Sequence, residues 1–176
     1  KNLDKEIKNF IEVEQKINDY ELYLKLVSRD GIPQLIINDA LPIIENEVNA
    51  VLEHMMAGFG ISIASEDKNI NLYIKYDDQE WPINLSSGME KFVSSLALRV
   101  GLINISNLPS PNFLVIDEGF GSLDSENLSN MKGAFDYLKT QFQSVFIISH
   151  LDTIKDFMDY LLPINVNNGY SSIIYN

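Results

Sequence analysis

Apolar residues recur near the start of the chain at the spacing of an amphipathic helix. Five positions of a 4-3-4-3 heptad pattern are apolar: Leu3, Ile7, Phe10, Ile17 and Leu24. The two remaining positions hold Glu14 and Glu21. The pattern predicts a helix over residues 3–27. It fits a helix packed on a partner helix at the root of a coiled coil, and equally an amphipathic helix lying on its own domain.

The periodicity then changes several times. Residues 30–33, Asp-Gly-Ile-Pro, break the first helix, and residues 34–57 resume a helical pattern that Pro42 is expected to kink or restart. Alternating residues at 61–64 and 72–76 predict two paired strands. Residues 86–106 predict a helix that is apolar on most sides and therefore buried.

The second half of the chain predicts a βαβ unit. Continuous apolar runs at 113–116 and 145–148 flank an amphipathic helical pattern at 125–141. Uninterrupted apolar strands are typical of a parallel sheet covered on both faces. Because parallel strands end at the same edge, Asp117, Glu118 and His150 should emerge together there, where open α/β sheets bind ligands.

Two short motifs carry candidate chemistry. An apolar strand that ends in Asp117-Glu118 fits a Walker B pattern, in which Asp117 holds Mg²⁺ and Glu118 polarises the attacking water. It also fits two exposed acids at a strand end. Ser87 and Glu90 have the spacing of a capping box, and the same helix start, Ser86-Ser87-Gly88, is suited to bind a phosphate.

Composition narrows the class of protein. The 176 residues include 13 Lys plus Arg, 25 Asp plus Glu and no Cys, which gives a net charge of −12. The absence of Cys excludes disulfides and Cys-based zinc sites, and no apolar run reaches the length of a membrane span. Residues 31–176 carry seven basic and eighteen acidic side chains, so this piece should bind DNA weakly if at all. The acidity equally fits simple solubility.

Four motifs in order resemble ABC-type ATPases. Leu85-Ser86-Ser87-Gly88 resembles their signature, 113–118 their Walker B, Ser122-Leu123-Asp124 their D-loop and His150 their switch histidine. Gly119-Phe120-Gly121 after the two acids is similar to the SMC-like branch. The lead-in helix with residues 30–37 is similar to the carboxyl-terminal lobe of SbcC-type double-strand-break repair ATPases.

The resemblance implies an α/β fold in which a parallel sheet with flanking helices follows a coiled-coil foot. Residues 1–28 would form the foot helix and 29–176 the carboxyl-terminal ATPase lobe. In such proteins the heads form a homodimer around two ATP molecules, and hydrolysis controls a nuclease that processes DNA ends. An SbcD-type nuclease would dock on the foot, with four apolar candidates there: Ile7, Phe10, Ile17 and Leu24.

The resemblance also implies a role for each site residue. Ser86, Ser87 and Gly88 would contact the γ-phosphate of ATP held by the opposite head. Asp124 would help to organise the attacking water across the interface, and His150 would contact the γ-phosphate in its own head. Glu118 would be the catalytic carboxylate and Asp117 the Mg²⁺ ligand.

The sequence departs from the family pattern in two respects. Ser87 stands where Gly is commonest, and Met89 stands where Gln or Glu is frequent, with Glu90 a candidate replacement one position on. No Gly-x-x-x-x-Gly-Lys-Ser/Thr loop occurs. The resemblance implies that this loop lies in an amino-terminal Walker A lobe before the coiled coil, so that this chain would be half a head. Because the first residue is not Met, we also expect a fragment.

Three alternatives remain at this stage: a non-hydrolysing scaffold that binds a nuclease, a chromosome-organising SMC head, and, least favoured, a transporter head. The resemblance further implies an intracellular protein with no membrane partner.

Overall fold

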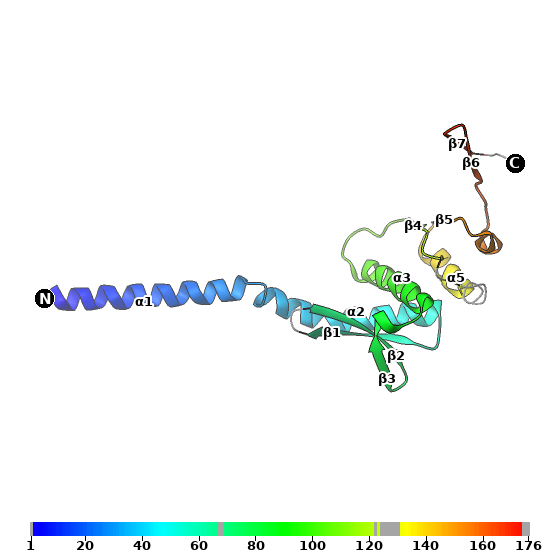
Figure 1. Ribbon diagram of the computed structural model, residues 1–176. Coiled ribbons are helices and arrows are strands. Elements are labelled where there is room, and N and C mark those ends of the chain that lie inside the picture. Colours follow the sequence, from blue (N-terminus) through cyan, green and yellow to red (C-terminus); the bar gives the residue numbers. More distant parts are fainter. Residues whose placement is uncertain (1, 67–68, 122, 124–130, 174–176) are drawn as a thin grey trace.

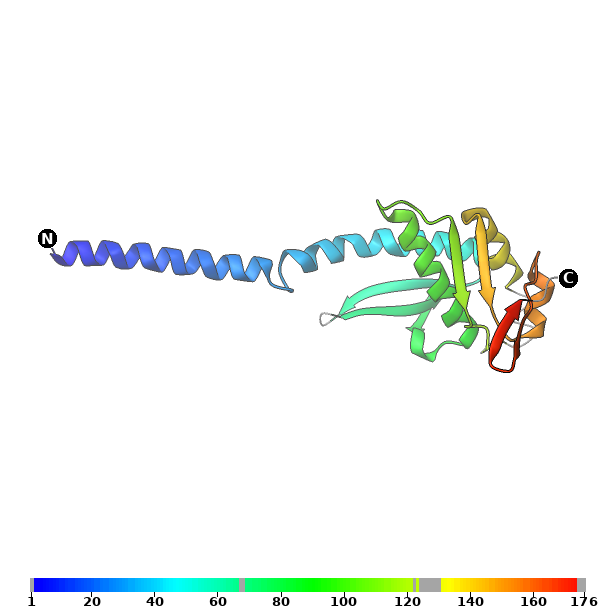
Figure 2. The same cartoon turned by 90° about the horizontal axis from the view of Figure 1, so that it is seen from above.

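The computed structural model describes residues 2–66, 69–121, 123 and 131–173. A long helix, α1 (Asn2–Val27), projects away from a body in which helices pack on a three-stranded and a two-stranded sheet (Figures 1 and 2). Every side chain from residue 3 to residue 27 is exposed. The predicted helix is therefore confirmed, and the alternative in which it lies on its own domain is wrong.

A tight turn joins α1 to α2 (Ile32–Met55). Ser28 donates its hydroxyl to Lys25 O at 2.7 Å, and Gly31 N–H donates to Ser28 O at 3.0 Å. A Cβ at Gly31 would lie 2.2 Å from Leu26 O, so only glycine fits beneath the end of α1. Helix α2 continues through Pro42, so the restart expected there does not occur.

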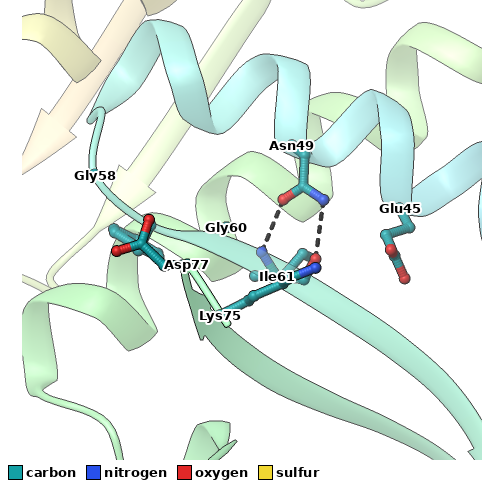
Figure 3. A pocket seen from close by; sticks show the side chains of 8 residues that line it. Glu45, Asn49, Gly58, Gly60, Ile61, Lys75 and Asp77 are labelled. Atoms are coloured by element: carbon teal, nitrogen blue, oxygen red, sulfur yellow. Dashed lines mark hydrogen bonds between the residues drawn. The ribbon is translucent and has the colours of Figure 1, made fainter. Parts of the chain in front are cut away.

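Three antiparallel strands, β1 (Gly60–Glu66), β2 (Asn69–Tyr76) and β3 (Gln79–Pro82), form a sheet in that order. The outer edge of β1 faces α2, whose side chains replace a further strand. Asn49 donates to Ile61 O at 2.9 Å and accepts from Ile61 N at 2.7 Å (Figure 3). Glu45 accepts from Ile63 N at 2.7 Å. This edge of the sheet is thereby closed within the chain.

Helix α3 (Gly88–Ile105) follows a short 3-10 turn, η1 (Ile83–Leu85), and packs along α2. Its buried apolar side chains confirm the prediction of a buried helix: Met89, Val93, Leu96, Ala97 and Val100. The two helices approach closely at Gly101, where a Cβ would lie 3.0 Å from Val48 Cγ2. Together α2 and α3 form the centre of the core.

The parallel direction of the predicted βαβ strands is confirmed. Strand β4 (Phe113–Asp117) pairs in parallel with β5 (Ser144–Ile148), and α5 (Lys132–Gln141) precedes β5. The expectation of a sheet covered on both faces is wrong for this chain. Alternate side chains are bare: Phe113 is 58% exposed, Val115 47%, Phe146 57% and Ile148 53%. The core covers only the other face.

After β5 the chain forms a 3-10 helix, η2 (Asp152–Phe157), and a hairpin of β6 (Ile164–Asn167) and β7 (Tyr170–Ile173). These elements are not among those predicted above. All residues of both hairpin strands are exposed, and the hairpin lies at the margin of the body in both views (Figures 1 and 2). Within the described part of the chain, no helix is long and apolar enough to cross a membrane.

Candidate active site

The two acids predicted to carry chemistry lie at the carboxyl end of β4. Asp117 is the last residue of the strand and pairs with Ile148 of β5. Glu118 continues the ladder by one hydrogen bond, from its N–H to Ile148 O at 2.9 Å. Its backbone then turns into the left-handed region, with φ of 57°, which non-glycine residues rarely adopt. The carboxylate is thus carried on a strained corner at the sheet edge.

His150 lies next to Glu118, as the parallel arrangement predicted. Its Nδ1 is 3.0 Å from Glu118 Oε1, although 32 residues separate the two in sequence. The side chains are 73% and 49% exposed, so both face solvent. A carboxylate and an imidazole in contact at an open sheet edge can together orient a water molecule and hold its proton.

The loop after the acids is anchored in the core by an aromatic ring. Phe120 is fully buried, with its ring 4.8 Å from that of Phe92 and 5.8 Å from that of Phe135. Gly119 before it has φ of 97°, and a Cβ there would lie 2.7 Å from Phe92 Cε2. Gly119 and Phe120 therefore fix the corner that carries Glu118. Sequence patterns identified these residues but not their contact with Phe92.

The start of α3 has the predicted capping box. Ser87 is the N-cap, and its hydroxyl accepts from Glu90 N–H at 3.2 Å. In return, Glu90 Oε2 accepts from Ser87 N–H at 2.6 Å. Ser87 is exposed at the positive end of an 18-residue helix, which is a suitable position for an anion.

The three candidate phosphate contacts differ in their surroundings. Ser86 is 9% exposed and donates its hydroxyl to Ile83 O at 2.7 Å, whereas Ser87 is exposed and Gly88 opens the helix. Ser87 therefore presents the accessible hydroxyl of this motif. Met89 is buried at 4% exposure, so its side chain faces the core.

Glu90, the candidate replacement for the polar group that Met89 lacks, is engaged in contacts within the chain. Both of its oxygens are occupied, one by Ser87 N–H and the other by the hydroxyl of Tyr76. Burial opposes ionisation of Glu90, but the hydrogen bonds from Tyr76 and Ser87 outweigh it and keep the pKa of Glu90 below its usual value. The Tyr76 contact was not foreseen, since nothing in the sequence pairs the end of β2 with α3.

The donor set at the sheet edge fits a magnesium ion better than a metal held by protein alone. Asp117 is exposed at the end of β4. Among the residues that the structure describes, no three His, Asp or Glu side chains gather into a metal site. Mg²⁺ commonly takes one or two carboxylates and completes its shell with water and phosphate, which matches this arrangement. Asp124, the candidate of the D-loop, lies outside the described residues.

A hollow beside Asn49 is lined by polar side chains that include Glu45, Lys75 and Asp77 (Figure 3). The Asn49 amide and Glu45 are engaged with the β1 backbone. His54, on the same helix, stacks on Tyr137 with ring centroids 5.4 Å apart. These groups have structural contacts and are separate from the candidate active site.

Comparison with known proteins places this geometry in context. No model of a protein family matches the sequence. The chain is 36% identical to the uncharacterized protein R555 of Acanthamoeba polyphaga mimivirus over 98% of its length. It is 30% identical to the SbcC component of nuclease SbcCD from Clostridium acetobutylicum over 94% of its length. It is 24% identical to the DNA double-strand break repair Rad50 ATPase of Thermococcus kodakarensis over 65%.

The chain is a homologue of the SbcC and Rad50 proteins. Its fold is that of an SMC-type ATPase head. The SMC head domain from Thermotoga maritima matches with a TM-score of 0.57 and 26% identity, over 78% of this chain and 49% of that one. A second structure, described under ATP-driven dimerization and DNA stimulated activation of SMC ATPases, matches with a TM-score of 0.63 and 15% identity. It covers 79% of this chain and 86% of that chain.

The chain spans only 13–14% of the length of these curated relatives. The homology confirms the predicted resemblance and the α/β class, with a long amino-terminal helix before the lobe. It supports terms such as DNA repair and ABC-type ATPase for the family. The roles of individual residues in this SbcC homologue remain proposals.

Proposed function

We propose that this SbcC homologue is the carboxyl-terminal half of an ATP-hydrolysing head, with residues 1–28 as coiled-coil foot and 29–176 as lobe. The observation that carries the proposal is the 3.0 Å contact between Glu118 and His150 at the end of two parallel strands. Both groups face solvent and can handle a proton; Glu118 is held by its backbone hydrogen bond to Ile148, and His150 follows two residues after the end of β5. This is the arrangement that hydrolysis of a phosphoanhydride requires.

Each residue at the edge has a distinct task. Glu118 accepts a hydrogen bond from the attacking water and orients it. His150 fixes the Glu118 carboxylate and faces the γ-phosphate of its own head. Asp117 holds the magnesium ion, which neutralises charge on the phosphates when ATP is bound. Asp124 helps to organise the same water from the opposite head.

The signature contributes in trans. Ser86, Ser87 and Gly88 face the γ-phosphate of ATP bound mainly by the other head of a homodimer. Ser87 is the principal contact in this proposal, because its exposed hydroxyl accepts from Glu90 N–H and keeps its own proton available to donate. The positive end of α3 adds to the attraction for phosphate.

The bare face of the parallel sheet supports the proposal that a Walker A lobe packs on it. Within the described residues, β4 and β5 pair only with each other. Phe113, Val115, Phe146 and Ile148 are about half exposed on one face. Exposed apolar surface of this kind marks an interface. The lobe that carries the phosphate-binding loop and its Lys would cover this sheet and complete the ATP site.

The exposed apolar side chains of the foot helix support the proposal that a partner helix and a nuclease dock on it. The four candidates for nuclease contact are all exposed: Ile7 at 50%, Phe10 at 67%, Ile17 at 51% and Leu24 at 63%. The name of the Clostridium relative assigns it to a nuclease complex, SbcCD. By this analogy an SbcD-type nuclease docks on α1. The acidic lobe leaves DNA binding to other parts of the complex.

A second function, that of a chromosome-organising SMC head, is favoured by the solved structures that share this fold. It would use the same ATP chemistry at Glu118. A third, a non-hydrolysing scaffold, differs in having no turnover. The experiment below separates the scaffold from both ATPases, and nuclease stimulation by ATP separates the repair head from the SMC head.

The test is ATP turnover by this chain assembled with its Walker A lobe, for wild type and Glu118→Gln. The matched control is Glu53→Gln, an exposed acid on α2 away from the sheet edge. Turnover should require both lobes, survive in the control and fall by about 100-fold or more in Glu118→Gln. Stable assembly and ATP binding without turnover would refute the hydrolase and favour the scaffold.

A further inference from the structure

Tyr76 connects the antiparallel sheet to the start of α3. It is the last residue of β2, and its hydroxyl donates to Glu90 Oε1, while the other oxygen of the same carboxylate accepts from Ser87 N–H. The carboxylate therefore lies between the tyrosine and the N-cap. No other hydrogen bond from the sheet to this carboxylate occurs among the described residues.

The tyrosine ring is itself held firmly. It stacks on Trp81 of β3, with centroids 5.3 Å apart and planes 13° apart, and lies at a tilt against Phe59, 5.8 Å away. Burial and the hydrogen bond to Glu90 raise the pKa of Tyr76 to about 12, so its hydroxyl keeps its proton at physiological pH. The donor is thus permanent and fixed in direction.

The remaining contacts of the motif leave Ser87 dependent on Glu90. Ser86 is fixed by Ile83 O, and Lys91 Nζ donates to Asn84 O at 2.9 Å. The Ser87 hydroxyl, in contrast, is oriented only by the capping box within the described residues. If Glu90 rotates away, the Ser87 backbone N–H loses its partner and the N-cap loosens.

We propose that Tyr76 is a positioning residue: it locks Glu90 in the capping box and so aims the Ser87 hydroxyl at the phosphate of ATP on the opposing head. This inference rests on the proposed function and adds to it a residue outside the signature. A contact to phosphate that is equal in the ground state and the transition state affects binding rather than the chemical step. Loss of the Tyr76 hydroxyl therefore raises KM for ATP and leaves kcat nearly unchanged.

The experiment measures KM and kcat for ATP in the assembled head, with Tyr76→Phe compared with Tyr73→Phe. Both changes remove one hydroxyl from β2 that donates to a glutamate, but Tyr73 donates to Glu66, away from the signature. The ring stack on Trp81 is kept in Tyr76→Phe. We expect KM to rise about tenfold in Tyr76→Phe, with kcat within about twofold, and neither to change in Tyr73→Phe.

A second variant keeps the proposal testable if Tyr76→Phe does not fold. Glu90→Gln removes the charged acceptor but keeps the shape of the side chain, and it should raise KM as well. The double variant Tyr76→Phe/Glu90→Gln should be no worse than the worse single variant, because both act through one contact. Fully additive effects would overturn the proposal, as would equal KM values for Tyr76→Phe and Tyr73→Phe.

Glu118→Gln, measured in parallel, distinguishes the two levels of failure. If it abolishes turnover while Tyr76→Phe leaves KM unchanged, only the role of Tyr76 is refuted. If turnover persists in Glu118→Gln, the proposed hydrolase site is wrong, and the inference that rests on it falls with it.

Discussion

Asn49 offers a direct test of how α2 holds the antiparallel sheet. Its side-chain amide both donates to and accepts from the backbone of Ile61, at 2.9 and 2.7 Å (Figure 3). Ile61 is 1% exposed, so its backbone groups have little access to water once Asn49 is removed. Each of the two backbone groups orphaned by the substitution costs about 1–3 kcal/mol, which predicts that Asn49→Ala lowers the free energy of unfolding by about 2–6 kcal/mol.

Asn49→Asp separates the two bonds by pH. The ionised carboxylate can accept from Ile61 N–H but repels Ile61 O, whereas the protonated acid can donate to that carbonyl as Asn does. The pKa of the introduced carboxyl in the folded state is therefore expected to be raised above its unfolded value. The stability supplied by the protonated carboxyl is fully present below the pKa that this group has in the unfolded chain. It is lost as pH rises through the pKa of the group in the folded chain. The deficit relative to wild type should thus shrink as pH falls through the folded pKa and be smallest below about pH 4.

Urea unfolding of the chain at pH 7 and at acid pH measures both effects. Asn46→Ala and Asn46→Asp are matched controls, since Asn46 is an exposed residue of the same helix. These controls should change the free energy of unfolding by less than about 0.5 kcal/mol. A deficit of Asn49→Asp that does not depend on pH, or Asn49 variants as stable as the Asn46 variants, would refute the role assigned to this amide.

Two further substitutions test the core around the site. Gly119→Ala should destabilise the chain by about 1–3 kcal/mol, because φ at this position is 97° and the new Cβ would meet Phe92. Gly121→Ala is the control, since its new Cβ would meet nothing within 4 Å. Equal urea midpoints for the two variants would contradict the prediction. Ser94→Ala should stabilise by about 1 kcal/mol, because its hydroxyl, 2% exposed, has no hydrogen-bond partner among the described residues. Thermal unfolding tests this: the melting temperature should rise in Ser94→Ala, and it should rise less or not at all in Ser95→Ala, a substitution at an exposed neighbouring position.

Much of the fold could be predicted because it follows from local patterns. The heptad spacing predicted α1, period two predicted β1 and β2, and apolar runs predicted the parallel pair of β4 and β5. The hairpin of β6 and β7 was missed, although β6 alternates apolar and polar residues and Asn168-Gly169, with φ of 51° and 81°, is a typical two-residue hairpin turn. The helix predicted over 125–141 is observed from Lys132, while 124–130 lie outside the described residues.

The site was predicted in part for the same reason. The contact of Glu118 with His150 follows from parallel pairing, which brings the ends of distant strands together. The capping box follows from the spacing of Ser87 and Glu90. The contact with Tyr76 could not be inferred, because it depends on how an antiparallel sheet packs against a helix.

The sequence by itself determined the main helices, the strands β1, β2, β4 and β5, and the polar residues that end them, because these depend on neighbours a few positions away. Only the tertiary structure decided what surrounds each element. It buried Ser86 and exposed Ser87, occupied both oxygens of Glu90, and left one face of β4 and β5 bare. Burial depends on chain segments far apart in sequence, which hydrophobic periodicity cannot specify.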